Sequence, residues 1–171
     1  MKLDGYDLRI LEALQRDGRM TKVKLAEQVH LSPTPCWERL KRLEDSGVIA
    51  GYHARIDLRR LATVTEVLVE VTLDRHRHHD FQRFESAVRD IAEIVECHAV
   101  GGGVDYLMKV VVPSVDAFQR LMDRLLTSDL GIGRYFSYVV TKPVKSAGEL
   151  PLRRLLEAQG EGARSDENFS S

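Results

Sequence analysis

The sequence lacks any run of about 18 apolar residues, which is the length that an apolar helix needs to cross a membrane. Its start, Met1-Lys2-Leu3-Asp4, is polar and acidic rather than typical of a secretion signal. It has only two cysteines, Cys36 and Cys97, far apart in the chain, so no disulfide framework is expected. We therefore expect a cytoplasmic protein with reduced thiols and no membrane partner.

The residue sets that catalysis requires are also missing. We find no convincing nucleophile with a base, no paired carboxylates and no phosphate-binding loop. His76, His78 and His79 suggest a metal, but no further ligand follows at zinc spacing, so a solvated loop is the better interpretation. The sequence predicts no enzyme, no cofactor and no metal site.

Net charge is close to zero, at -1, which argues against a protein coated with basic charge. Residues 1–60 nevertheless hold 12 Lys and Arg against 9 Asp and Glu, whereas the remainder holds 13 against 17. The N-terminal part is thus the better candidate for a polyanion partner, although a difference of this size also arises by chance in a two-domain protein.

The stretch 31–45 has the pattern of a short amphipathic helix. Ser32 stands at the N-cap position and Pro33 at the first helical position, and Pro33, Cys36, Leu40 and Leu43 form one apolar stripe. Asp4 and Thr21 can cap two earlier helices, and only residues 30–31 separate the second helix from the third. Three helices with this tight turn predict a helix-turn-helix, followed by a strand-like wing or linker over residues 48–57.

The opposite arc of the third helix carries side chains that suit a DNA groove. Arginine reaches guanine or phosphate, glutamate accepts from the cytosine amino group, and hydroxyls bind phosphates. The candidate DNA-contacting residues are Lys22, Ser32, Thr34, Pro35, Glu38, Arg39 and Arg42. The alternative is a solvated face with internal ion pairs, such as one between Glu38 and Arg42. Cys36 lies on the inward stripe and is expected in the core, and Trp37 is expected to pack on the first helix.

The hydrophobic period changes after about residue 61, which indicates a second domain. Strands are expected over 66–73, 94–100, 106–112 and 134–141, and helices over 79–91 and after Ser114. The order βαββαβ is that of a ferredoxin-like fold, so the whole chain is α+β. Apolar residues on both strand faces predict a homodimer made sheet to sheet, which suits a helix-turn-helix protein reading two half-sites.

Three glycines join the second and third of these strands. Backbone amides there could approach a carboxylate closely, and Asp105 could bind an ammonium group. The candidate ligand-binding residues are Gly101, Gly102, Gly103, Asp105, Tyr106 and Tyr138. The alternative is a hairpin that simply needs flexible residues.

These motifs resemble the Lrp/AsnC, or feast-famine, family of transcription regulators over about residues 3–145. The resemblance rests on residues 31–36, 38–44, 47–49 and 51–52 in the first domain, and on Glu96-Cys97-His98, residues 101–110 and Tyr138-Val139-Val140 in the second. It implies a sequence-specific DNA-binding regulator that responds to an amino acid or related metabolite. It further implies homodimers assembling to tetramers or octamers, with the effector near the glycine turn where dimers meet.

The chain departs from that pattern at three places. His30 replaces the usual turn glycine, Trp37 replaces an aliphatic residue, and the tail is longer than in many members. We expect a helix-turn-helix domain with wing or linker at 1–60, a ferredoxin-like ligand-binding and oligomerisation domain at 61–145, and a largely disordered extension at 146–171. The rival hypotheses are a metabolite-binding protein or enzyme that uses the second domain, and a metal or redox sensor.

Overall fold

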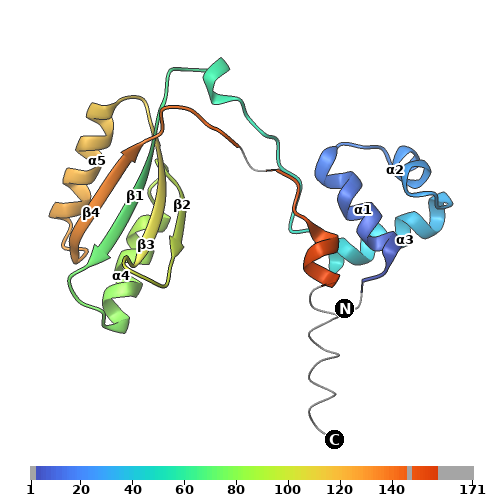
Figure 1. Cartoon of the computed structure of the whole chain (residues 1–171), viewed down its shortest axis with the longest axis horizontal. Helices are drawn as coiled ribbons and strands as arrows, with labels where there is room; N and C mark the ends of the chain where they lie inside the picture. The colour runs from blue at the N-terminus through green and yellow to red at the C-terminus, as the bar shows by residue number, and fades with distance from the viewer. Residues whose placement is uncertain (1–2, 146–147, 158–171) are drawn as a thin grey trace, which may run out of the picture. The chain divides into compact units, whose positions relative to one another are not determined.

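The structure is a computed structural model that describes residues 3–145 and 148–157. It forms two compact units (Figure 1). Among the described residues, the helical unit combines residues 3–55 with 145 and 148–157, and the sheet unit comprises residues 56–144. The first division is close to the expected boundary, but the described part of the C-terminal extension belongs to the helical unit. The disorder expected toward the chain end concerns residues outside the described ranges.

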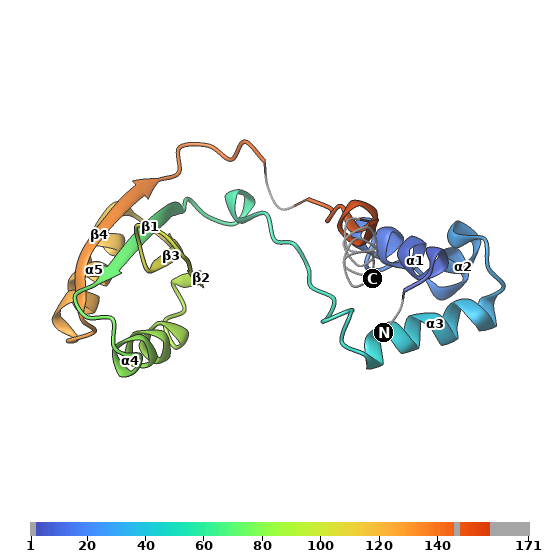
Figure 2. The same cartoon turned by 60° about the horizontal axis from the view of Figure 1, so that its bottom comes forward.

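Three helices build the helical unit, as the capping and periodicity predicted: α1 (Gly5–Arg16), α2 (Lys22–Val29) and α3 (Pro33–Asp45) (Figure 2). The Asp4 carboxylate caps α1 and the Thr21 hydroxyl caps α2. Ser32 stands at the N-cap of α3 without a side-chain capping bond, so this helix start relies on Pro33, whose fixed φ suits the first turn and which has no N–H to satisfy.

The core of the helical unit is made by the apolar stripes of all three helices. Cys36 is 2% exposed within it, and burial raises the pKa of its thiol, which keeps the group protonated and unreactive. Cys36 is therefore scaffold, as predicted. The buried cluster consists of Ile10, Leu11, Ala13, Leu25, Ala26, Val29, Cys36, Leu40 and Leu43.

The turn between α2 and α3 adopts the left-handed conformation that glycine usually provides. His30 has φ 58° and ψ 48°, and its N–H donates to the Glu27 carbonyl. The next N–H, that of Leu31, donates to the Ala26 carbonyl, which completes the end of α2. The tight turn therefore forms despite the histidine.

Residues 48–57, all within the described ranges, pair with no strand and run extended toward a 3-10 turn, η1 (Leu58–Arg60). Of the two expectations for this segment, the structure shows the linker rather than a paired wing. Near the other end of the chain, residues 152–157 form a short helix within the helical unit (Figures 1 and 2).

The sheet unit has the predicted βαββαβ order. Its elements are β1 (Thr65–Leu73), α4 (His78–Arg89), β2 (Ile94–Ala99), β3 (Tyr106–Val112), α5 (Val115–Thr127) and β4 (Ile132–Val139). All pairings are antiparallel and the spatial order is β2-β3-β1-β4, which is the ferredoxin-like arrangement. No helix in the described residues is long and apolar enough to span a membrane.

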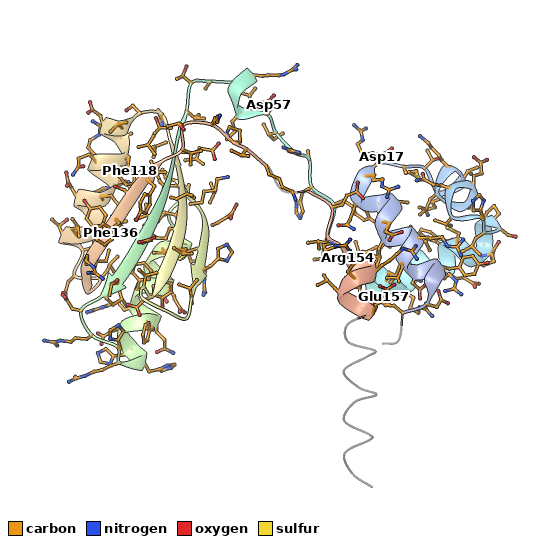
Figure 3. All side chains as sticks on the ribbon, viewed as in Figure 1. Asp17, Asp57, Phe118, Phe136, Arg154 and Glu157 are labelled. Atoms are coloured by element: carbon orange, nitrogen blue, oxygen red, sulfur yellow. The ribbon has the colours of Figure 1, made fainter. Side chains whose placement is uncertain are left out.

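Both helices cover one face of this sheet. Alternate residues of β1 and β3 pack with apolar side chains of α4 and α5, including Phe84 and Phe118, in one buried cluster (Figure 3). The other face, which we call the open face, leaves large apolar side chains about half exposed. They are Leu68 at 48%, Leu107 at 42%, Phe136 at 48% and Tyr138 at 52%.

Both edge strands contain an irregularity. In β2, Ile94 and Glu96 pair with consecutive residues of β3, so Val95 is the additional residue. In β4, Ile132 and Arg134 pair with consecutive residues of β1, so Gly133 is the additional residue. Each is a β-bulge, which bends the strand locally and interrupts its hydrogen-bond ladder.

Candidate nucleic-acid interface and effector site

The outer face of α3 is the first candidate site. Thr34, Pro35, Glu38 and Lys41 are exposed along it, while Cys36, Leu40 and Leu43 fix the opposite side in the core. Ser32 is exposed at the start of the helix. Lys41 was not in the predicted set, although the same helical spacing places it on this face.

Arg39 and Arg42 turn toward α1 rather than straight outward. Their guanidinium groups reach Asp7, which is fully buried: Arg39 lies 2.9 Å from one carboxylate oxygen and Arg42 2.7 Å from the other. Arg39 also contacts Asp4 at 2.6 Å. The ion pair considered between Glu38 and Arg42 is not among the interactions of the described residues, because Arg42 is engaged by α1.

Asp7 lies at the centre of this arginine cluster, and both of its carboxylate oxygens accept hydrogen bonds. Besides both arginines, it accepts the backbone N–H of Asp4 at 3.0 Å and so closes the capping box of α1. The Asp7 N–H and Arg39 hold the pKa of Asp4 below its usual value, and Asp4 and Asp7 together raise the pKa of Arg39. The side chain of Arg39 is 26% exposed and that of Arg42 is 49% exposed, so Arg42 retains the greater access to solvent.

Lys22 and Trp37 form a second contact between helices. The Lys22 ammonium lies 2.9 Å from the centre of the Trp37 ring, a cation–π arrangement that joins the start of α2 to α3. Trp37 is 38% exposed. This contact of Trp37 is made with α2, and the expected packing of its ring on α1 stays a prediction.

The glycine turn is the second candidate site. Gly102 has φ 145°, and within the described residues a Cβ at any of the three glycines would meet no atom within 4 Å. The space above these amides is thus open. The turn is closed by the Val100 N–H, which donates to the Asp105 carbonyl at 3.0 Å.

Asp105 is held firmly at the end of that turn. Its Oδ2 accepts the Leu73 N–H at 2.8 Å and lies 3.1 Å from His76 Nε2. The sequence suggests His76 only as part of a metal cluster, whereas the structure brings its side chain to Asp105 at the candidate effector site. His79 instead contacts Asp80, and the described residues contain no group of three or more His, Cys, Asp or Glu arranged to hold a metal.

The two predicted tyrosines lie on opposite faces of the sheet. Tyr106 is buried on the helix-covered face and donates to Glu85 at 2.9 Å; burial and Glu85 raise its pKa strongly. Tyr138 is on the open face and donates to Glu70 at 3.3 Å. Within one chain they therefore line different surfaces.

Each tyrosine borders its own cavity. Tyr106 lines one of about 350 Å³ with Glu85, Val88, Arg89, Cys97 and Ala99, beside the start of the glycine turn. Tyr138 lines one of about 290 Å³ on the open face with Leu68, Leu107 and Lys109 among others. Glu85 and Arg89 were not among the residues predicted from the sequence to bind a ligand, because they reach this cavity only through the packing of α4 beside β2.

Cys97 lines the first cavity and is exposed. Desolvation at the cavity and the nearby Glu85 carboxylate raise the pKa of its thiol, which disfavours the reactive thiolate.

Comparisons with known proteins agree with this architecture. Residues 3–50 match the family model for winged helix-turn-helix DNA-binding, and residues 66–150 match that of the Lrp/AsnC ligand binding domain. The transcriptional regulatory protein DoeX of Halomonas elongata is 57% identical over 85% of this chain and 92% of its own length. The leucine-responsive regulatory protein of Escherichia coli is 42% identical over 88% of this chain and 92% of its own.

Solved structures show the same likeness. A Neisseria meningitidis transcriptional regulator in complex with L-Met has a TM-score of 0.84 at 34% identity, covering 90% of this chain and 99% of the other. An AsnC family transcriptional regulator from Agrobacterium tumefaciens has a TM-score of 0.83 at 34% identity, covering 89% and 99%. With both domains matched in order, this chain belongs to the Lrp/AsnC family of DNA-binding transcription regulators and is not an enzyme.

Proposed function

We propose that two copies of this chain read an operator through the outer faces of their α3 helices, and that an amino acid or related metabolite bound at the glycine turn changes that binding. The observation that carries the DNA part is the exposed polar row on a helix whose other side is fixed in a core. Such a helix enters the major groove of DNA, where side chains reach the base edges.

The candidate DNA contacts divide into two roles. Thr34, Pro35, Glu38 and the added Lys41 face outward and are placed to meet base edges. Ser32, Lys22 and the half-exposed Arg42 are placed for phosphates, which contribute affinity more than sequence preference. Arg39, more enclosed by α1, contributes mainly by fixing α3.

A gel-shift titration tests this division on an operator selected from genomic fragments that the protein retains. Glu38→Gln should change which sequences are preferred, and Lys41→Ala should weaken binding by about 1–3 kcal/mol and relax the preference at the base pair that Lys41 meets. Lys142→Ala, an exposed lysine of the sheet unit, is the matched control. Wild-type affinity and preference in both α3 variants would contradict the assignment of this face.

The effector part rests on the fixed carboxylate of Asp105 beside open backbone amides. Amides of the glycine turn suit the carboxylate of an amino acid, and Asp105 with its partner His76 suits the ammonium end. The relative solved with L-Met shows that a similar chain binds an amino acid. The charged pair Glu85 and Arg89 in the adjacent cavity offers further polar contacts.

A thermal-shift screen of the common amino acids and their breakdown intermediates tests the effector site, because a ligand that binds the folded state raises the unfolding temperature. Asp105→Asn keeps an oxygen that can accept the Leu73 N–H and removes the charge, so it should abolish the shift. Asp116→Asn, an exposed aspartate of α5, is the control. An undiminished shift in Asp105→Asn would contradict the role given to its charge.

The oligomeric state is part of the same proposal. The half-exposed apolar side chains of the open face favour a homodimer made sheet to sheet, which assembles further to tetramers or octamers. Phe136→Glu places a charge in that face and should yield monomers by light scattering, whereas Arg120→Glu, at an exposed position of α5, should not. A Phe136→Glu protein of unchanged mass would contradict this interface.

Because the protein binds DNA, we place it in the cytoplasm.

A further inference from the structure

The outer face of α1 is covered by a segment that neither the DNA-binding nor the effector function requires. Residues 149–157, which we call the C-terminal segment, belong to the same compact unit as α1 (Figure 1). They follow β4 by some ten residues and return to a helix more than 130 residues earlier in the chain. A contact of this sequence separation is costly in chain entropy unless specific interactions offset it.

Polar contacts fix the segment along one side of α1. Arg153 binds Glu12 through two donors, at 2.8 and 3.0 Å, which is the fork geometry that arginine makes with a carboxylate. One turn further along α1, Gln15 accepts the Leu150 N–H at 2.6 Å, and Arg16 lies 3.1 Å from Glu149. The charges are complementary at both ends of this contact.

An apolar anchor lies between these polar contacts. Leu152 is partly buried and packs against the core cluster of the helical unit. The short helix also has exposed positions outside this contact, among them Arg154 (Figure 3). The segment thus has one face that fits α1 and one that does not.

We propose that the outer face of α1 is a docking site for the chain's own C-terminal segment. The docked segment gives the sheet unit a second covalent route to the DNA-binding unit, through residues 140–148, besides the linker at 48–64. A chain held at two points samples fewer arrangements than one held at a single point.

Hydrogen exchange in the full-length protein tests the docking. Arg153→Glu should speed exchange of the α1 amides about threefold, the effect of losing one partly exposed ion pair, and Leu152→Asp should speed it more. Adding Glu12→Arg to Arg153→Glu restores opposite charges and should restore slow exchange, which loss of folding would not. Arg154→Glu, on the exposed side of the same helix, is the matched control. Equal α1 exchange in Arg153→Glu and Arg154→Glu would overturn the proposal.

Cross-linking tests whose segment occupies the site. In a Cys97→Ser background, Gln15→Cys and Leu150→Cys place two accessible thiols beside each other, with Cys36 buried. A short bismaleimide should give a single chain that has gained one linker and lost both free thiols, as read by mass spectrometry and thiol titration. A product of doubled mass would assign the docked segment to a second copy and overturn docking within one chain. Neither measurement requires DNA or an amino acid, so a negative result leaves the proposed function standing.

Discussion

Removing the buried charge of Asp7 should loosen the whole helical unit. Its carboxylate is fully buried and receives four hydrogen bonds: one from the Asp4 N–H, one from Arg39 and two from Arg42. In Asp7→Ala these donors lose their acceptor. In Asp7→Asn the shape is kept, but an amide N–H₂ faces the two guanidinium groups, so half of the acceptor capacity is lost.

The magnitude follows from the burial of the partners. Breaking a fully buried ion pair costs about 3–5 kcal/mol, whereas an exposed pair contributes less than about 1 kcal/mol. The two arginine side chains are 26% and 49% exposed and can turn to water, so their share falls between these limits. With about 1 kcal/mol for the capping box, Asp7→Ala should lower the free energy of unfolding of this unit by about 2–3 kcal/mol.

Urea unfolding measures the effect, because the single tryptophan, Trp37, lies in α3 and reports on this unit alone. With a slope of about 1 kcal/mol/M for so small a unit, the midpoint should fall by about 2 M. Asp45→Asn, an exposed aspartate at the end of α3, is the control. A midpoint for Asp7→Ala equal to that of the control would refute the view that Asp7 holds α3 in place.

Three further outcomes are expected from the same unit. His30→Gly should raise its stability by about 0.5–1 kcal/mol in urea unfolding, because glycine adopts φ 58° without the cost that a side chain incurs. The pKa of Asp4 is lowered in the folded state from 3.8, so its ionised carboxylate stabilises the folded state fully above pH 3.8, and this stabilisation is lost as the pH falls through the lower folded pKa. When the urea midpoint is measured at several acidic pH values, it should fall less steeply with decreasing pH in Asp4→Asn than in the wild type. Burial and the bond to Glu44 raise the pKa of Tyr52 to about 12, so the tyrosinate absorbance that disappears in Tyr52→Phe should titrate near pH 12. In Glu44→Gln it should titrate at a lower pH, because the charge of Glu44 is gone and burial alone raises the pKa.

Local patterns were sufficient to predict the elements and the fold. The N-cap positions of Asp4 and Thr21, the stripe of Cys36 and Leu40, and the alternation in β1 depend only on residues within a few positions of one another. They therefore identify three helices and a βαββαβ unit without knowledge of any distant contact. The buried Cys36 follows from the same local rules, whereas the tight turn at His30 was expected from the glycine that the family resemblance places there.

The sites depend on contacts that no local pattern contains. Asp7 lies 32 residues before Arg39 and 35 before Arg42, so the helical spacing that placed both arginines near the outer face of α3 could not show that α1 engages them. Tyr106 pairs opposite Val71, whereas Tyr138 pairs opposite Leu68, and only this register reveals that they face opposite sides. The contact of Glu12 with Arg153 spans 141 residues and has no signature in either segment.

The bulges at Val95 and Gly133 set a limit on how this protein aggregates. A sheet whose edges are straight and unpaired invites strand addition from other molecules, which grows without end into fibres. Here both edge strands are bent by an extra residue, while the half-exposed apolar side chains lie on the open face. Growth by edge pairing is thus disfavoured, whereas the proposed sheet-to-sheet association would stop once the open face is covered, which favours assemblies of finite size.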